Sequence, residues 1–130
     1  MKLNPSRFAP LLQSVLRIAA AAVFIPHGTQ KLLNVPDGHG TAAMFSQMWF
    51  AGVLELFGGT LMLAGLFTRP VAFALSGEMF AAYLIAHYPR GTWPIVNGGE
   101  LAVLFCFLWL YFAAAGPGPV SLDAMVRGKR

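Results

Sequence analysis

The chain has 130 residues, of which 57% are hydrophobic and only 11% are charged. Soluble domains carry roughly 25% charged residues, so this composition excludes an ordinary soluble domain and indicates an integral membrane protein. The length allows one domain of about four spans of roughly 20 residues each, without a large soluble domain beside them. The formal net charge of +4 comes from scattered basic residues. A nucleic-acid-binding protein would need a clustered basic face, so no nucleic acid partner is expected.

Four apolar segments follow one another along the chain, and each is expected to be a membrane-spanning helix. Helices are favoured because an open strand edge would leave backbone groups unsatisfied in lipid. In the first segment, Arg17 interrupts the apolar run too early for a cleaved signal peptide, so the segment is interpreted as a retained span. Prolines and glycines separate the later segments. The predicted spans cover residues 11–33, 50–67, 71–88 and 98–115.

The tail of residues 116–130 begins with a stretch rich in proline and glycine, and a short surface helix is expected within residues 121–130. An even number of spans places both chain ends on the same side of the bilayer. Lys and Arg accumulate beside the cytoplasmic ends of spans. The side of the two termini would carry Lys2, Arg7, Arg69, Arg127, Lys129 and Arg130, and the other side only Lys31 and Arg90. The pattern predicts an all-α bundle of four transmembrane helices, a single membrane domain over residues 1–130 with cytoplasmic termini.

This topology gathers polar side chains at the noncytoplasmic end of the bundle. With a rise of about 1.5 Å per residue, His27 in the first span and Glu55 in the second are expected at nearly the same depth, where they could meet. Polar groups that converge on an apolar cavity are typical of a small-ligand site. The candidate catalytic and cofactor-binding residues are His27, Gln30, Lys31, Glu55, His87, Trp93, Asn97 and Glu100.

Glu55, Glu78 and Glu100 lie in or at the edge of apolar segments. Carboxylates at membrane depth are rare and usually face a partner or a polar path, so each is a candidate functional residue. Glu78 enters the membrane from the cytoplasmic side, and so does Arg17, at depths that differ by about one helical turn. The two are predicted to form a structural ion pair that fixes helix register, and a proton-carrying role is the alternative.

Structural explanations compete with ligand binding at the outer end. Asn97 and Glu100 have the N-x-x-E spacing of a capping box, whose side chains satisfy the amides at a helix start. His27 could bond to backbone groups freed by the proline before it. Lys31 could extend to lipid headgroups. For Glu55, a structural hydrogen bond is the alternative to a proton-linked role.

The histidines and carboxylates include the side-chain types that bind metal ions, but their spacing matches no motif such as HExxH. No bound metal ion is therefore expected, and a haem held by two histidines is expected still less. Cys106 is the only cysteine, which excludes an internal disulfide and a CxxC redox pair.

Four runs of residues together match the pattern of a known family. The first is HGTQK at residues 27–31, and the second is Glu55 with GG at 58–59, followed by GLFTRP at 65–70. The third is WP at 93–94 with NGGE at 97–100, and the fourth is GPGPVSLDA at 116–124. In order and spacing they resemble the HGxxK element, the second helix with its following turn, the fourth-helix entrance and the tail of the DoxX family. The resemblance covers nearly the whole chain.

The resemblance implies a multi-pass, four-helix protein of the bacterial cytoplasmic (inner) membrane. The family name is attached to subunits of thiosulfate:quinone oxidoreductase and to membrane partners of thiol-stress redox complexes. The leading hypothesis is a membrane subunit that binds a quinone or similar apolar carrier and works beside a redox partner protein. His27 and Lys31 would hydrogen-bond to a ring carbonyl, Glu55 and Glu100 would relay protons, and Trp93 would form a wall of the pocket.

Two other classes of function stay open. The first is a noncatalytic interaction or assembly module, whose polar residues only lock the bundle. The second is a transporter of protons or a small solute. Four helices enclose a narrow path, and the two halves of the chain show no repeat, so transport would require a homo-oligomer. The chain lacks the extra soluble region and paired cysteines expected of a self-sufficient sulfur oxidoreductase, so whether it is catalytic at all also stays open.

Overall fold

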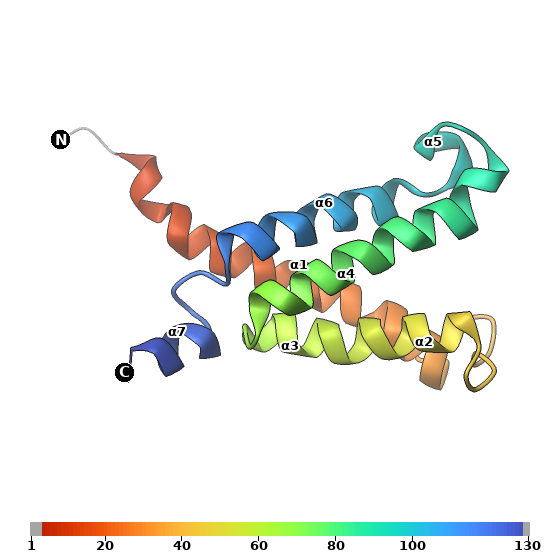
Figure 1. The fold of residues 1–130 in the computed structure, drawn as a ribbon, viewed down its shortest axis with the longest axis horizontal. Helices are drawn as coiled ribbons and strands as arrows, with labels where there is room; N and C mark the ends of the chain where they lie inside the picture. The colour runs from red at the N-terminus through yellow and green to blue at the C-terminus, as the bar shows by residue number, and fades with distance from the viewer. Residues whose placement is uncertain (1–3, 129–130) are drawn as a thin grey trace.

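The computed structural model describes residues 4–128, and this part of the chain contains helices and no strand (Figure 1). In chain order the elements are η1 (Pro5–Phe8), α1 (Ala9–Leu33), α2 (Gln47–Val53), η2 (Leu54–Gly58), α3 (Gly59–Ala64), α4 (Thr68–Ala82), η3 (Tyr83–His87), η4 (Tyr88–Arg90), α5 (Pro94–Asn97), α6 (Glu100–Ala115) and α7 (Leu122–Arg127). The elements η2 and η3 are π-helical turns that continue α2 and α4. The predicted all-helical fold is therefore confirmed for the described residues.

Among residues 4–128, three continuous helical segments are long and apolar enough to cross a membrane, namely Pro5–Leu33, Gln47–Ala64 and Thr68–Arg90. The fourth, α6, is apolar but has only 16 residues, which corresponds to about 24 Å. Large apolar side chains cover the outside of the segments, as Phe73, Leu104 and Phe107 show with exposed fractions of 65–68%. Such a surface suits contact with lipid.

The helix ends follow from local chemistry. The second predicted span lies three residues too far along the chain at both ends. Ser46 starts α2 early by accepting a hydrogen bond from the Trp49 amide at 3.2 Å. At the other end, Gly65 takes a left-handed conformation with φ +70° and terminates α3.

The helical segments associate as two pairs. The segment α1 packs along α2, η2 and α3, and α4 packs along α6. In Figure 1 the pairs lie together on the left, near η1 and α7, and diverge to the right, toward α5 and the connection of residues 34–46. We call the left side the tail end and the right side the cavity end. Where the pairs meet, a fully buried core forms from Phe24, Met62, Leu75, Trp109 and Phe112.

Arg17 is a buried structural residue at the tail end, and the predicted ion pair with Glu78 is wrong. Its guanidinium donates from Nε to the Met62 carbonyl and from Nη2 to the Val120 carbonyl, both at 2.8 Å, and from Nη1 to the Pro117 carbonyl. The helix α1 extends past the bundle, so Arg17 lies level with the turn that precedes α4. Glu78 is ten residues into α4, about 15 Å beyond that turn.

The short helix α7 confirms the surface helix expected within residues 121–130. Its Asp123 accepts hydrogen bonds from the Phe67 amide at 2.9 Å and the Thr68 amide at 3.0 Å. Burial opposes ionisation of Asp123, but the bonds from Thr68 and Phe67 outweigh it, so the pKa of Asp123 is lowered. The tail is thereby attached to the start of α4.

The basic residues divide between the two ends of the bundle much as the sequence predicts. Arg7, Arg69 and Arg127 belong to tail-end elements, whereas Lys31 and Arg90 belong to cavity-end elements. The predicted roles of Lys2, Lys129 and Arg130 fall outside the described residues. Which end faces the cytoplasm stays a prediction.

Candidate functional site

A cavity of about 940 Å³ lies among the helix pairs, and α1, α2, η2, α4, η3 and α6 all contribute to its lining. Its walls are mainly apolar and include Phe24, Leu54 and Phe105. Five titratable side chains also line it: His27, Lys31, Glu55, Glu78 and His87. An apolar cavity with a few convergent polar groups is the usual form of a small-molecule site. The predicted convergence is therefore present in part.

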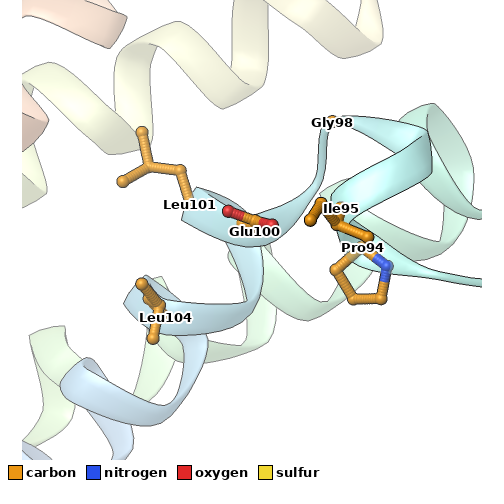
Figure 2. Close-up of a pocket in the computed structure, with 6 residues that line it drawn as sticks. All are labelled: Pro94, Ile95, Gly98, Glu100, Leu101 and Leu104. Carbon is orange, nitrogen blue, oxygen red and sulfur yellow. The ribbon is translucent and has the colours of Figure 1, made fainter.

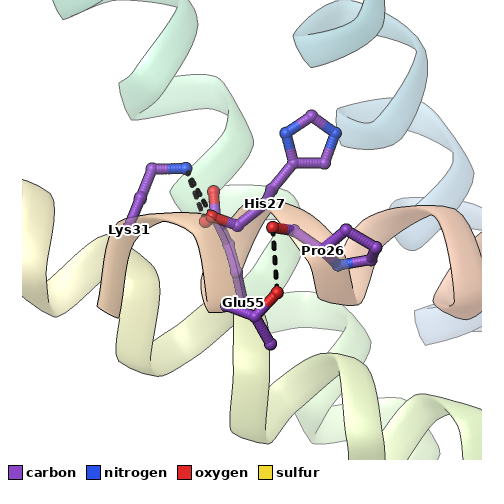
Figure 3. A network of polar contacts seen from close by, with 5 residues as sticks. Pro26, His27, Lys31 and Glu55 are labelled. Carbon is purple, nitrogen blue, oxygen red and sulfur yellow. Dashed lines mark hydrogen bonds and ion pairs between the residues drawn. The ribbon is translucent and has the colours of Figure 1, made fainter. Parts of the chain in front are cut away.

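Lys31 and Glu55 form an ion pair across two helices, with Nζ 2.6 Å from Oε2 (Figure 3). The Glu55 side chain is only 3% exposed and that of Lys31 is 22% exposed. Gly28 permits the close approach of their helices, because a Cβ there would lie 2.5 Å from the Leu56 amide nitrogen. The π-helical turn η2 carries Glu55, and such turns often occur at functional sites. Lys31 thus faces the bundle interior, and the headgroup interpretation is wrong.

His27 lines the cavity but does not meet Glu55 in a hydrogen bond. Its ring points away from the ion pair in Figure 3, toward α6. The ring centroid lies 6.5 Å from those of both Phe24 and Phe105. Within residues 4–128 its ring makes no hydrogen bond to the backbone, so the structural alternative based on Pro26 is wrong. The imidazole is available to a ligand in the cavity.

Glu78 reaches the same cavity from α4. The helix α4 packs against η2, so Glu78 and Glu55 line the cavity from neighbouring elements. Both carboxyl oxygens of Glu78 are buried, and no side-chain or backbone donor of the described residues reaches them. Glu78 is therefore a cavity residue and no partner of Arg17.

His87 lies on η3, where its ring stacks on Tyr83 at a centroid distance of 6.3 Å. Its Nδ1 is 3.2 Å from the Asn97 carbonyl oxygen. Asn97 itself is buried, donating from Nδ2 to Tyr83 Oη at 3.1 Å and to the Gly91 carbonyl at 2.9 Å. Asn97 is absent from the cavity lining. It therefore positions His87, which lines the cavity, and would not contact a ligand there.

Two other predicted site residues, Gln30 and Trp93, also lie outside the cavity. Gln30 donates to the carbonyls of Pro36 and Asp37 in the adjoining connection. Trp93 is 70% exposed and lines no part of the cavity, so its predicted role as a wall is wrong.

Glu100 is exposed and lines a second hollow of about 460 Å³ between α5 and the start of α6 (Figure 2). The capping box, the structural alternative for Asn97 and Glu100, does not form. Gly99 is the N-cap of α6 without a side-chain cap, and the Gly99 amide donates to Asn97 Oδ1 at 2.8 Å. The physical reason is the turn at Gly98, whose φ of +73° ends α5 and turns the chain before α6 begins. Glu100 consequently does not join Glu55.

A periodic signal in the sequence could have placed Glu78 in the cavity. Ala74, Glu78, Ala81 and Ile85 follow one another at spacings of four and three residues, and all four line the cavity. Such spacing puts residues on one helix face. In the described part of the chain, no three histidine, cysteine or carboxylate side chains gather closely enough to hold a metal ion.

Comparison with known proteins gives one family and one close relative. The model of the DoxX family matches residues 12–88. A protein of Haemophilus influenzae (strain ATCC 51907 / DSM 11121 / KW20 / Rd), described as an uncharacterized protein, is 43% identical over 126 residues. The alignment covers 92% of this chain and 94% of that protein. No solved structure matches the chain.

Proposed function

The chain belongs to the DoxX family of membrane proteins, and from this premise we propose that it is a small membrane subunit of a redox system that binds a quinone or similar apolar molecule. We place it in the bacterial inner membrane as a four-span protein with cytoplasmic termini, so that the cavity faces the outer side. The observation that carries the proposal is the apolar cavity of about 940 Å³ with titratable side chains from both helix pairs.

The cavity fits a substituted ring with polar oxygens. Its volume lies in the range of roughly 300–1,000 Å³ that is usual for ligand sites. Phe24 and Phe105 supply apolar walls, while the ammonium of Lys31 and the unbonded imidazole of His27 supply hydrogen-bond donors. A ring carbonyl is an acceptor, so it complements these two groups. The structure thus supports a ligand with an acceptor oxygen on an apolar frame.

A bound quinone would supply redox chemistry that moves protons together with electrons. The chain's own residues would hold the ring and move protons. His27 and Glu55 are suited to proton exchange because each lines the cavity with an ionisable side chain. A separate redox protein would exchange the electrons, and a homo-oligomer is compatible with this role. The relay proposed here uses Glu55 without Glu100, since Glu100 lies outside the cavity.

The test is equilibrium binding of a short-chain ubiquinone analogue to the purified protein in phospholipid nanodiscs. The wild type is expected to bind, and His27→Phe and Lys31→Met should each weaken binding about tenfold or more, because a hydrogen bond to a charged or polar donor is lost. Gln30→Ala is the matched control, since Gln30 neighbours Lys31 in sequence but bonds to the Pro36 and Asp37 carbonyls.

Absence of binding by the wild type would overturn the proposal, and so would an equal loss in Gln30→Ala. Partner-dependent quinone reduction provides the functional readout. Glu55→Gln should lower it while Glu100→Gln leaves it unchanged. If the protein were only an assembly module, Glu55→Gln would change association with partners and no quinone would bind.

A further inference from the structure

Two carboxyl groups meet in the cavity beside one cation. Glu55 on η2 is ion-paired with Lys31 through Oε2 at 2.6 Å. Glu78 approaches from α4, on the opposite helix pair, and lines the same cavity where α4 packs against η2. No donor among the described residues reaches either oxygen of Glu78, and both are buried. An ionised Glu78 would therefore be buried without a hydrogen-bond donor.

We propose that Glu55 and Glu78 share a single proton, one as a carboxylic acid that donates a hydrogen bond to the other as a carboxylate. The pair is then a proton-binding site of the cavity, in which Lys31 balances the one remaining negative charge. The shared proton rests on the burial and charge of these three side chains in one cavity. Its exchange with a bound ligand rests on the proposed function.

Charge balance supports this arrangement. Two ionised carboxylates and one ammonium would leave one uncompensated charge in an apolar site, which is strongly unfavourable. A proton between the carboxyls removes that charge and gives the buried oxygens of Glu78 the hydrogen bond that they otherwise lack. One added proton thus resolves both the charge and the hydrogen-bonding deficit.

The other charged and titratable groups around the cavity do not offer an equivalent solution. His27 and Lys31 face it from α1, and His87 faces it from η3. His87 is engaged with the Asn97 carbonyl, at 3.2 Å, and among the described residues Glu55 forms its ion pair with Lys31 and not with His27. The residues that α6 contributes carry no charge: Leu101, Ala102 and Phe105. Lys31 is therefore the cation that balances the pair.

Infrared spectroscopy of the purified protein in nanodiscs tests the shared proton directly. At neutral pH the wild type should show the C=O stretching band of a protonated, buried carboxyl, which shifts on exchange into D₂O. Glu78→Gln should abolish the band, because the single remaining carboxyl pairs with Lys31. Glu100→Gln, which changes an exposed carboxyl on α6, should retain it. Absence of the band in the wild type, or its retention in Glu78→Gln, would overturn the proposal.

A second variant keeps the test decisive should Glu78→Gln fail to fold. Lys31→Met removes the cation, so both carboxyls must be neutral and the band should grow about twofold. An unchanged band in this variant contradicts the charge balance.

Addition of the ubiquinone analogue separates this proposal from the proposed function. If the wild type shows the band but does not bind the analogue, the result supports the shared proton and counts against quinone binding. Binding of the analogue without any protonated-carboxyl band supports the proposed function and contradicts the shared proton.

Discussion

The Nζ atom of Lys31 lies 2.6 Å from Oε2 of Glu55, across a sequence separation of 24 residues. This contact joins α1 to the π-helical turn η2 at the cavity end. Glu78 lines the same cavity from α4, and in the proposed proton-sharing pair Lys31 balances the one negative charge of the two carboxyls. The ion pair therefore joins two helices and supplies a cation to the cavity.

The ion pair predicts strong coupling between its two residues. Lys31→Met leaves a buried carboxyl without its cation and should lower the free energy of unfolding by about 3 kcal/mol. The double variant Lys31→Met with Glu55→Met should recover much of this loss, since apolar residues replace both charges. Reversible unfolding in mixed detergent micelles measures the cycle. Additive effects of the two single changes would contradict a direct interaction.

Arg17 is predicted to stabilise the tail end independently of Glu78. Arg17→Lys cannot reach the three carbonyls that the guanidinium satisfies, and should cost about 3 kcal/mol in unfolding free energy. The exposed Arg7→Lys is the control. Combining Arg17→Lys with Glu78→Gln should give additive effects within about 0.5 kcal/mol. A larger coupling free energy between the two changes would support the Arg17–Glu78 ion pair that the sequence predicted.

Gly28 and Gly77 should respond oppositely to alanine. At Gly28 an added Cβ meets backbone, 2.5 Å from the Leu56 nitrogen and 2.8 Å from the Gly52 oxygen. The helices must move apart, so Gly28→Ala should cost about 2 kcal/mol and weaken the Lys31–Glu55 pair. At Gly77 nothing lies within 4 Å, and Gly77→Ala should stabilise by up to about 1 kcal/mol. Equal unfolding free energies for the two variants would argue against this helix contact.

Asp123 should make the attachment of the tail sensitive to acid. Its pKa is lowered in the folded protein, so its contribution is complete above the unfolded value of about 3.9 and is lost as pH falls through the lower folded value. The thermal midpoint of Asp123→Asn should lie below that of the wild type at pH 7, and the two should converge in strong acid. Asp37→Asn controls for loss of a surface charge. A difference that persists at the lowest pH would show that the carboxylate is not responsible.

Much of the fold could be predicted because its signals are local. Apolar runs gave the helical segments within a few residues, and the predicted end at residue 33 agrees with α1. The placement of His27, Lys31, Glu55 and His87 at one end followed from helical rise and alternating direction, and all four line the cavity. Trp93 and Glu100 were misplaced because their orientation depends on the turns at Gly91 and Gly98, where φ is positive.

By itself, the sequence determined that this is a helical membrane protein and which polar residues gather at one end of it, because hydropathy and rise per residue are properties of each segment alone. Tertiary packing decided how far each helix slides along its neighbours and which face it turns inward. That offset set Arg17 among the tail-end carbonyls and brought Glu78 into the cavity that Glu55 lines. The physical reason is that contacts between helices, such as the close approach at Gly28, determine depth and rotation together.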